Sequence, residues 1–159
     1  MRRRESGFTL TELLVTATIL GVLAGVALPL VKVAIQREQE TALRRALRTV
    51  REAIDAYKRL ADENKIEVEE GTDGYPPTLQ VLVEGVKSKA AAKDGKSEAE
   101  KVVKFLRRVP VDPMTKSTDC GLRSSQDPPE ATICGEQNVY DIYTKSRRTA
   151  LDGTKVRDW

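Results

Sequence analysis

The stretch FTLTELLVTATILGVLAGVALPLV, residues 8–31, decides how this chain is built. Its one charged residue is Glu12, and residues 13–31 form an uncharged run of 19 residues. A helix needs about 20 apolar residues to cross the hydrocarbon layer of a bilayer. Three arginines at residues 2–4 precede the run, and a basic flank favours the cytoplasmic side. We therefore expect one membrane-spanning helix, with the rest of the chain exported.

The composition of the chain excludes much enzyme chemistry. None of its 159 residues is His, so imidazole bases and His metal ligands are absent. Carboxylate pairs such as Asp112 with Asp119, or Asp141 with Asp152, are expected by coincidence in a chain with 24 acidic residues. The net charge of +3 combines 27 basic with 24 acidic residues, whereas nucleic-acid-binding domains are usually more strongly basic. We expect no enzymatic activity, no cofactor and no nucleic-acid partner.

Interpreting the segment as an ordinary membrane anchor does not account for Glu12. An ionised carboxylate inside the hydrocarbon layer costs several kcal/mol by most estimates, so Glu12 needs a cationic partner. Cleavage after Gly7 would turn Phe8 into a new N-terminus, and its α-amino group would lie one helical turn from Glu12. The same amine on a neighbouring copy of the chain could then neutralise the carboxylate.

A secretory signal peptide is the simpler interpretation of this segment. A signal peptide has a basic start, an apolar stretch of about 7–15 residues and a cleavage site between small residues. Here the apolar run is longer, its best small-residue site (Gly25 to Ala27) lies inside the run, and Pro29 follows two residues later. The fit to a signal peptide is therefore poor.

The segment RRRESGFTLTELLV, residues 2–15, resembles the class III leader of type IV pilins and type II secretion pseudopilins. That leader is short and basic and ends in Gly, which is followed by Phe and by Glu at the fifth mature position. The resemblance implies that residues 1–7 are a leader peptide. It also implies that a prepilin peptidase cleaves between Gly7 and Phe8 and N-methylates Phe8, and that Phe8 and Glu12 act in assembly.

Helix-weakening residues occur within the membrane segment, residues 8–31. Gly21, Gly25 and Pro29 follow one another at intervals of four, and Pro in a helix interior removes a backbone hydrogen bond. In the resembling family this region can lose helical order when subunits pack into a filament. The alternative is that transmembrane helices simply tolerate Gly and Pro.

Residues 32–64 are expected to continue the helix outside the membrane with an amphipathic pattern. Apolar residues recur at alternating intervals of four and three, at Leu43, Leu47, Val50, Ile54, Tyr57 and Ala61. The opposite face is charged and we expect it to be solvated; it carries Arg44, Arg45, Arg48, Arg51, Glu52, Asp55, Lys58 and Arg59. The apolar stripe must therefore cover another part of the chain.

That part is the head, residues 65–159, which has few large apolar side chains of its own. We expect a turn at residues 72–74, a short helix within residues 78–85 and a strand within residues 138–144. A hairpin through residues 145–148 and a short edge segment after an Asp-Gly turn would follow.

Five short stretches resemble the major pseudopilins of type II secretion in their order and spacing: Gly74-Tyr75-Pro76, residues 79–85, residues 108–113, residues 140–143 and Asp158-Trp159. The resemblance implies a type IV pilin-like α+β fold, in which the long N-terminal helix packs on a small antiparallel sheet of about three strands.

The resemblance also implies calcium binding in the head, whereas a pair of cysteines there departs from the pattern of major pseudopilins. Major pseudopilins generally bind calcium near the C-terminus, for which Asp141, Asp152 and Asp158 are the candidates here. The comparable stretch is shorter and basic, so the alternative is that these aspartates form turns. Cys120 and Cys134 lie on the exported side, where disulfides persist, and we expect them to bond; two free thiols are the alternative.

The function implied is a structural subunit of the periplasmic pseudopilus of a type II protein secretion system. Copies would polymerise through the N-terminal helix into a helical filament that drives exoprotein export. The implied partners are minor pseudopilins, an inner-membrane assembly platform with its ATPase, and prepilin peptidase. The chain would cross the bacterial inner membrane once, with a cytoplasmic leader and a periplasmic head. The alternative is a type IV pilin of an extracellular pilus, for adhesion, twitching or DNA uptake, which a C-terminal disulfide loop would suit.

Overall fold

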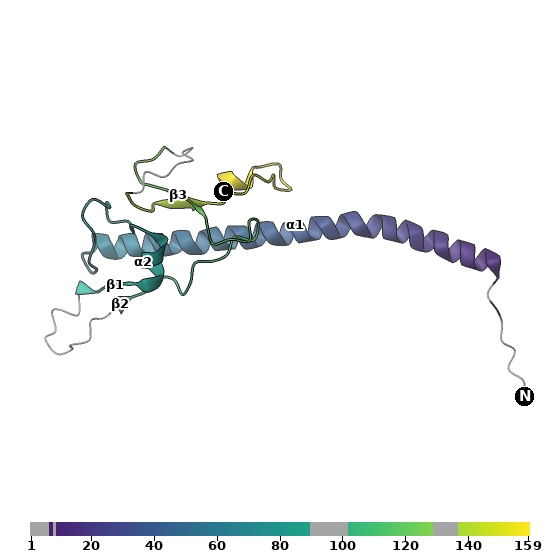
Figure 1. Cartoon of the computed structure of the whole chain (residues 1–159), viewed down its shortest axis with the longest axis horizontal. Coiled ribbons are helices and arrows are strands. Elements are labelled where there is room, and N and C mark those ends of the chain that lie inside the picture. The colour runs from purple at the N-terminus through teal and green to yellow at the C-terminus, as the bar shows by residue number, and fades with distance from the viewer. Residues whose placement is uncertain (1–6, 8, 90–101, 129–136) are drawn as a thin grey trace, which may run out of the picture. The chain divides into compact units, whose positions relative to one another are not determined.

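The computed structural model of the chain describes residues 7, 9–89, 102–128 and 137–159. The chain forms two compact units, Met1–Glu38 and Gln39–Trp159, and one long helix, α1 (Leu10–Asp62), contributes to both. The remaining elements belong to the second unit (Figure 1): α2 (Leu79–Glu84), β1 (Val86–Lys87), β2 (Val102–Val103), β3 (Gly121–Arg123), β4 (Asp141–Tyr143) and the 3₁₀ helix η2 (Val156–Asp158). This arrangement confirms the predicted α+β fold.

Local chemistry sets both ends of α1. At its start, the backbone amide of Glu12 donates to Oγ1 of Thr9 at 3.3 Å, which is half of a Thr-x-x-Glu capping box. At its end, Asn64 adopts a left-handed conformation with φ of 56°, and its amide donates back to the carbonyl of Ala61 at 2.9 Å. The helix therefore ends at Asp62, close to the predicted limit at residue 64.

The part of α1 in the first unit keeps its apolar side chains exposed. It contains a window of 18 residues with a mean hydropathy of 2.3, none of which is buried within the chain. The polar groups in this window are satisfied locally, because the hydroxyls of Thr16 and Thr18 donate to the carbonyls of Leu13 and Leu14. By length and composition, α1 is suited to cross a membrane.

The part of α1 in the second unit supplies the centre of the hydrophobic core. The predicted apolar stripe is buried at Leu43, Leu47, Val50, Ile54 and Tyr57, together with Ala53, while Ala61 is partly buried at its edge. These side chains pack against Ile66, Leu82, Leu106, Val139, Ile142, Ala150 and Val156. The expectation that the helix completes the core of the head is confirmed.

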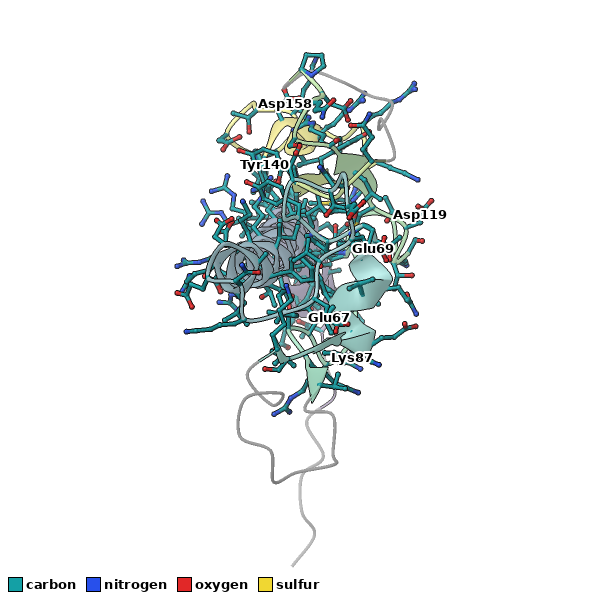
Figure 2. The ribbon with its side chains drawn as sticks, turned by 90° about the vertical axis from the view of Figure 1, so that its left-hand side faces the viewer. Glu67, Glu69, Lys87, Asp119, Tyr140 and Asp158 are labelled. Atoms are coloured by element: carbon teal, nitrogen blue, oxygen red, sulfur yellow. The ribbon has the colours of Figure 1, made fainter. Side chains whose placement is uncertain are left out.

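The strands form two separate antiparallel pairs rather than one sheet of about three strands. β1 pairs with β2 (Val86 opposite Val103), and β3 pairs with β4 (Leu122 opposite Ile142). Figures 1 and 2 place the two pairs on opposite sides of α1. Because strands of two or three residues have little stability of their own, each pair depends on packing against the helix.

The end of the chain also differs from the prediction. β4 pairs with β3, the strand that precedes it in the chain. Among the described residues, no hairpin forms through residues 145–148. The hydroxyl of Thr144 donates to Asp112 at 2.5 Å and accepts from the amide of Ser146 at 3.1 Å. The second of these bonds is local, and local side-chain bonds to the backbone compete with a strand ladder. After the predicted turn at Gly153, the expected edge segment is the 3₁₀ helix η2.

Asn138 ties the predicted turn at residues 72–74 to the segment after β3. Its side chain is 1% exposed, and its amide nitrogen donates to the carbonyl of Thr72 and to Oγ of Ser125, each at 3.0 Å. Its amide oxygen accepts from Oγ of Ser124 at 3.1 Å and from the amide of Ser125 at 3.0 Å. All its polar groups are used, so this buried amide holds the loops in one arrangement.

Replacing Ile54 tests the role of α1 in the core. Ile54→Ala should lower the free energy of unfolding by about 2–5 kcal/mol, because Ile54 is fully buried and its loss leaves a cavity. The control is Arg59→Ala on the exposed side of the same helix, with an expected change within about 0.5 kcal/mol. Urea unfolding of the detergent-extracted chain, followed by the fluorescence of its single tryptophan, Trp159, measures both. Equal unfolding midpoints for the two variants would show that α1 is not part of the core.

Candidate functional site

Glu12 lies exposed in the first turn of α1. Its carboxylate makes no ion pair within the described part of the chain, and its backbone amide donates to Oγ1 of Thr9. Gly7 is exposed, whereas Phe8 lies outside the described residues, so the pairing of Phe8 with Glu12 stays a prediction. The Thr-x-x-Glu spacing in the sequence is the signal that predicts this bond between Thr9 and the amide of Glu12.

The surface of α1 around Gly21 and Gly25 is open. A Cβ added at either glycine would meet nothing within 4 Å, so the fold of the chain itself does not require glycine there. Glycines four residues apart share one helix face and allow a neighbouring helix to approach closely in a membrane. α1 is continuous through Gly21, Gly25 and Pro29, and loosening of this stretch on assembly stays a prediction.

The large apolar side chains that surround these glycines are also uncovered. Their exposed fractions range from 78% at Leu10 to 43% at Val33, and Ile35 is still 50% exposed. An uninterrupted apolar surface of this kind marks a membrane or protein contact. Lipid or other helices must therefore cover the first unit.

Of the three candidate calcium ligands, Asp141 is held by two arginines. Its Oδ1 accepts from Nε of Arg51 at 2.7 Å, and its Oδ2 lies 3.5 Å from Nη1 of Arg123. Asp152 accepts from Nη2 of Arg44 at 3.2 Å and from the amide and hydroxyl of Thr154 at 2.9 and 2.6 Å.

The third candidate, Asp158, lies exposed in η2. Within the described residues, no three acidic, Cys or His side chains are grouped so that they could hold a metal ion. Calcium requires several oxygen ligands around one point, and here guanidinium groups lie against the carboxylates of Asp141 and Asp152. The arrangement of Asp141, Asp152 and Asp158 does not fit a calcium ion.

The acidic pairs considered as catalytic candidates are used in local structure. Asp112 is 2% exposed and accepts from the amide of Met114 at 2.7 Å as well as from the hydroxyl of Thr144. Asp119 forms an ion pair with Lys145 at 2.7 Å. Both carboxylates are therefore engaged in contacts that hold loops together.

Cys120 is half-buried beside β3. Burial raises the pKa of its thiol, and the charges of Asp112 and Asp119 raise it further. As a free thiol, Cys120 would therefore be a weak nucleophile. Cys134 lies outside the described residues, so their disulfide stays a prediction.

The chain matches the family model of the prokaryotic N-terminal methylation motif over residues 2–28. Together with the exposed apolar helix, this match defines the class: membrane-anchored prokaryotic proteins that carry an N-terminal methylation motif.

The family within this class follows from a match along most of the chain. Over 112 residues the chain is 30% identical to the type II secretion system core protein G of Pseudomonas aeruginosa, and the match covers 70% of each protein. The chain belongs to this family, the major pseudopilins of type II secretion systems. No solved structure matches the chain.

The disulfide can be tested directly on protein recovered from the membrane. Because Cys120 and Cys134 are expected to bond, proteolysis without reduction followed by mass spectrometry should give one peptide that links them. Reduction before proteolysis is the control and should separate the two halves. Two cysteines that react with an alkylating reagent before reduction would refute the bond.

Proposed function

We propose that this chain is the structural subunit of the periplasmic pseudopilus of a type II protein secretion system. The observation that carries the proposal is the stretch of α1 up to residue 31, whose large apolar side chains are uncovered and whose only charged residue is Glu12. Membership of the core protein G family supports the same role. Copies of the chain polymerise through this helix, and the growing filament drives exoprotein export.

Packing between copies of α1 holds the filament together. The open faces of Gly21 and Gly25 let helices approach closely, which strengthens dispersion contacts between the surrounding apolar side chains. Polymerisation thus covers the apolar surface that the head leaves uncovered.

Glu12 sets the position at which each copy is added. Its carboxylate is stable in an apolar surrounding only beside a cation, and the α-amino group of Phe8 on a neighbouring copy supplies one. A copy added at another offset would leave both charges without a partner. The ion pair therefore acts chiefly on specificity, while the apolar contacts supply cohesion.

Processing by a prepilin peptidase creates that amine. The enzyme cleaves between Gly7 and Phe8 and N-methylates Phe8, and residues 2–4 keep the leader in the cytoplasm beforehand. The head, residues 65–159, lies in the periplasm, so the chain crosses the inner membrane once.

The role of the chain is mechanical and not catalytic. We expect its other partners to be minor pseudopilins and an inner-membrane assembly platform with its ATPase, which supplies the energy for growth. A type IV pilin of an extracellular pilus is the alternative, and the relationship to core protein G disfavours it.

Two substitutions of Glu12 separate the charge of its side chain from the size of that side chain. Glu12→Gln removes the charge and keeps the shape, whereas Glu12→Ala also truncates the side chain; both keep the backbone amide that donates to Thr9. We expect both variants to be inserted and processed but to form no filaments, because the Phe8 amine loses its anionic partner. Electron microscopy of filaments, an assay of secreted proteins and the intact mass of the chain are the readouts.

The outcomes distinguish the parts of this proposal. Normal filaments from Glu12→Gln would disprove charge pairing, and loss of filaments in Glu12→Ala alone would assign Glu12 a role in side-chain packing. An intact mass for a chain beginning at methylated Phe8 supports processing. A chain beginning at Met1, or after Ala27, in cells with a working prepilin peptidase would disprove it.

A further inference from the structure

The C-terminal segment of the head, residues 148–159, lies against the polar face of α1. Near its start, Nη1 of Arg148 donates to Oε1 of Gln39 at 3.1 Å. The amide of Leu151 donates to Oε1 of Glu40 at 2.9 Å. The side chains of two adjacent helix residues thus hold the first half of the segment.

Arg44 holds the middle and the end of the segment together. Its guanidinium lies 3.2 Å from the carboxylate of Asp152 and 4.0 Å from the centre of the Trp159 ring. The indole nitrogen of Trp159 donates to Oγ1 of Thr154 at 2.8 Å, so the ring is fixed over the arginine. Hydrogen bonds from Thr154, with the charge of Arg44, lower the pKa of Asp152.

Arg51 binds three different residues of the head at once. Its Nε donates to Asp141 at 2.7 Å, and its Nη2 donates to the carbonyls of Ile142 at 3.1 Å and Trp159 at 2.6 Å. One guanidinium therefore joins α1, β4 and the last residue. Arg44 and Arg51 belong to the helix face that the sequence predicts to be solvated. Arg44 is exposed, but the C-terminal segment partly covers Arg51.

Arg123 brings a second positive charge to Asp141 from β3. Its side chain is 18% exposed, and its guanidinium also stacks on the ring of Tyr143, 4.7 Å from the ring centre. Asp141 therefore lies between a helix and a strand, each of which supplies an arginine.

We propose that these three arginines form an internal lock that takes the place of a bound cation, so that the head closes without calcium. A calcium ion would gather the carboxylates of Asp141 and Asp152 around one point, whereas Arg44, Arg51 and Arg123 neutralise them where they lie. Guanidinium groups suit this role because they are planar, permanently charged donors that can bind a carboxylate and backbone carbonyls at once. Arg51 uses this geometry fully, whereas Lys has a single donor atom.

The proposal concerns the head alone and does not depend on filament assembly. It predicts that the C-terminal segment stays attached to α1 whether or not divalent cations are present. It also predicts that loss of Arg51 detaches the segment, because Asp141 and two carbonyls lose their donor together.

The first measurement uses the wild-type chain extracted in detergent. Quenching of Trp159 fluorescence by acrylamide reports whether the segment is attached, and urea unfolding reports the stability of the head. We expect the same quenching constant and the same unfolding midpoint in millimolar calcium chloride and in excess chelator. A rise of the midpoint in calcium that equimolar magnesium does not reproduce would overturn the proposal.

The second measurement compares Arg51→Ala with Arg48→Ala. Arg48 lies one turn away and pairs with Glu52 at 2.8 Å, but its side chain is 81% exposed, so its loss should change the unfolding constant less than about threefold. Arg51→Ala should raise the unfolding constant about 10- to 100-fold and increase the quenching of Trp159. Equal effects of the two substitutions would overturn the proposal. If Arg51→Ala fails to fold, the calcium and chelator comparison on the wild-type chain still decides the question.

Discussion

Burial of the apolar stripe of α1 is the interaction on which the rest of the structure depends. The strands have two or three residues each and form two separate pairs, which are too small to be stable alone. Residues such as Leu43, Ile54 and Tyr57 give these pairs a common surface to pack on. The head is therefore organised around the second part of α1, the helix whose first part is the apolar segment.

The same helix presents two different surfaces along its length. In the second unit its apolar side chains are buried by the head, whereas in the first unit they remain exposed from Leu10 to Ile35. A helix with an uncovered apolar surface must be covered by lipid before assembly and, as we propose, by other copies afterwards. Glu12 fits this change of surroundings, because a carboxylate at this position becomes stable when a neighbour supplies a cation.

The polar face of α1 in the second unit is more than a solvated surface. Arg44 and Arg51 bind the C-terminal segment and hold Asp152 and Asp141, two residues that the resemblance to major pseudopilins offered as calcium ligands. A closed head can be reached with a metal ion or with internal cations, since either compensates the negative charge of the aspartates. In this chain the arginines are the groups in contact with the carboxylates.

The local patterns explain why part of this molecule was predictable. The long helix, its apolar stripe and its end near residue 64 follow from a 3.6-residue period and from a residue that tolerates a left-handed conformation. The turn at residues 72–74 and the short helix α2, with Gly85 at its C-cap, are also set by nearby residues.

Strand pairing and charge pairing were decided by the tertiary structure. β4 pairs with β3 and not with the residues that follow it, and the next residue, Thr144, bonds to Asp112, which lies 32 positions earlier. Arg51 meets Asp141 across 90 positions, and no local pattern distinguishes it from Arg48, which stays in solvent. The sequence by itself determined the membrane helix and the class of the protein, because periodicity and leader motifs are local. Only the fold decided which charged residues meet, because those contacts join residues that are distant along the chain.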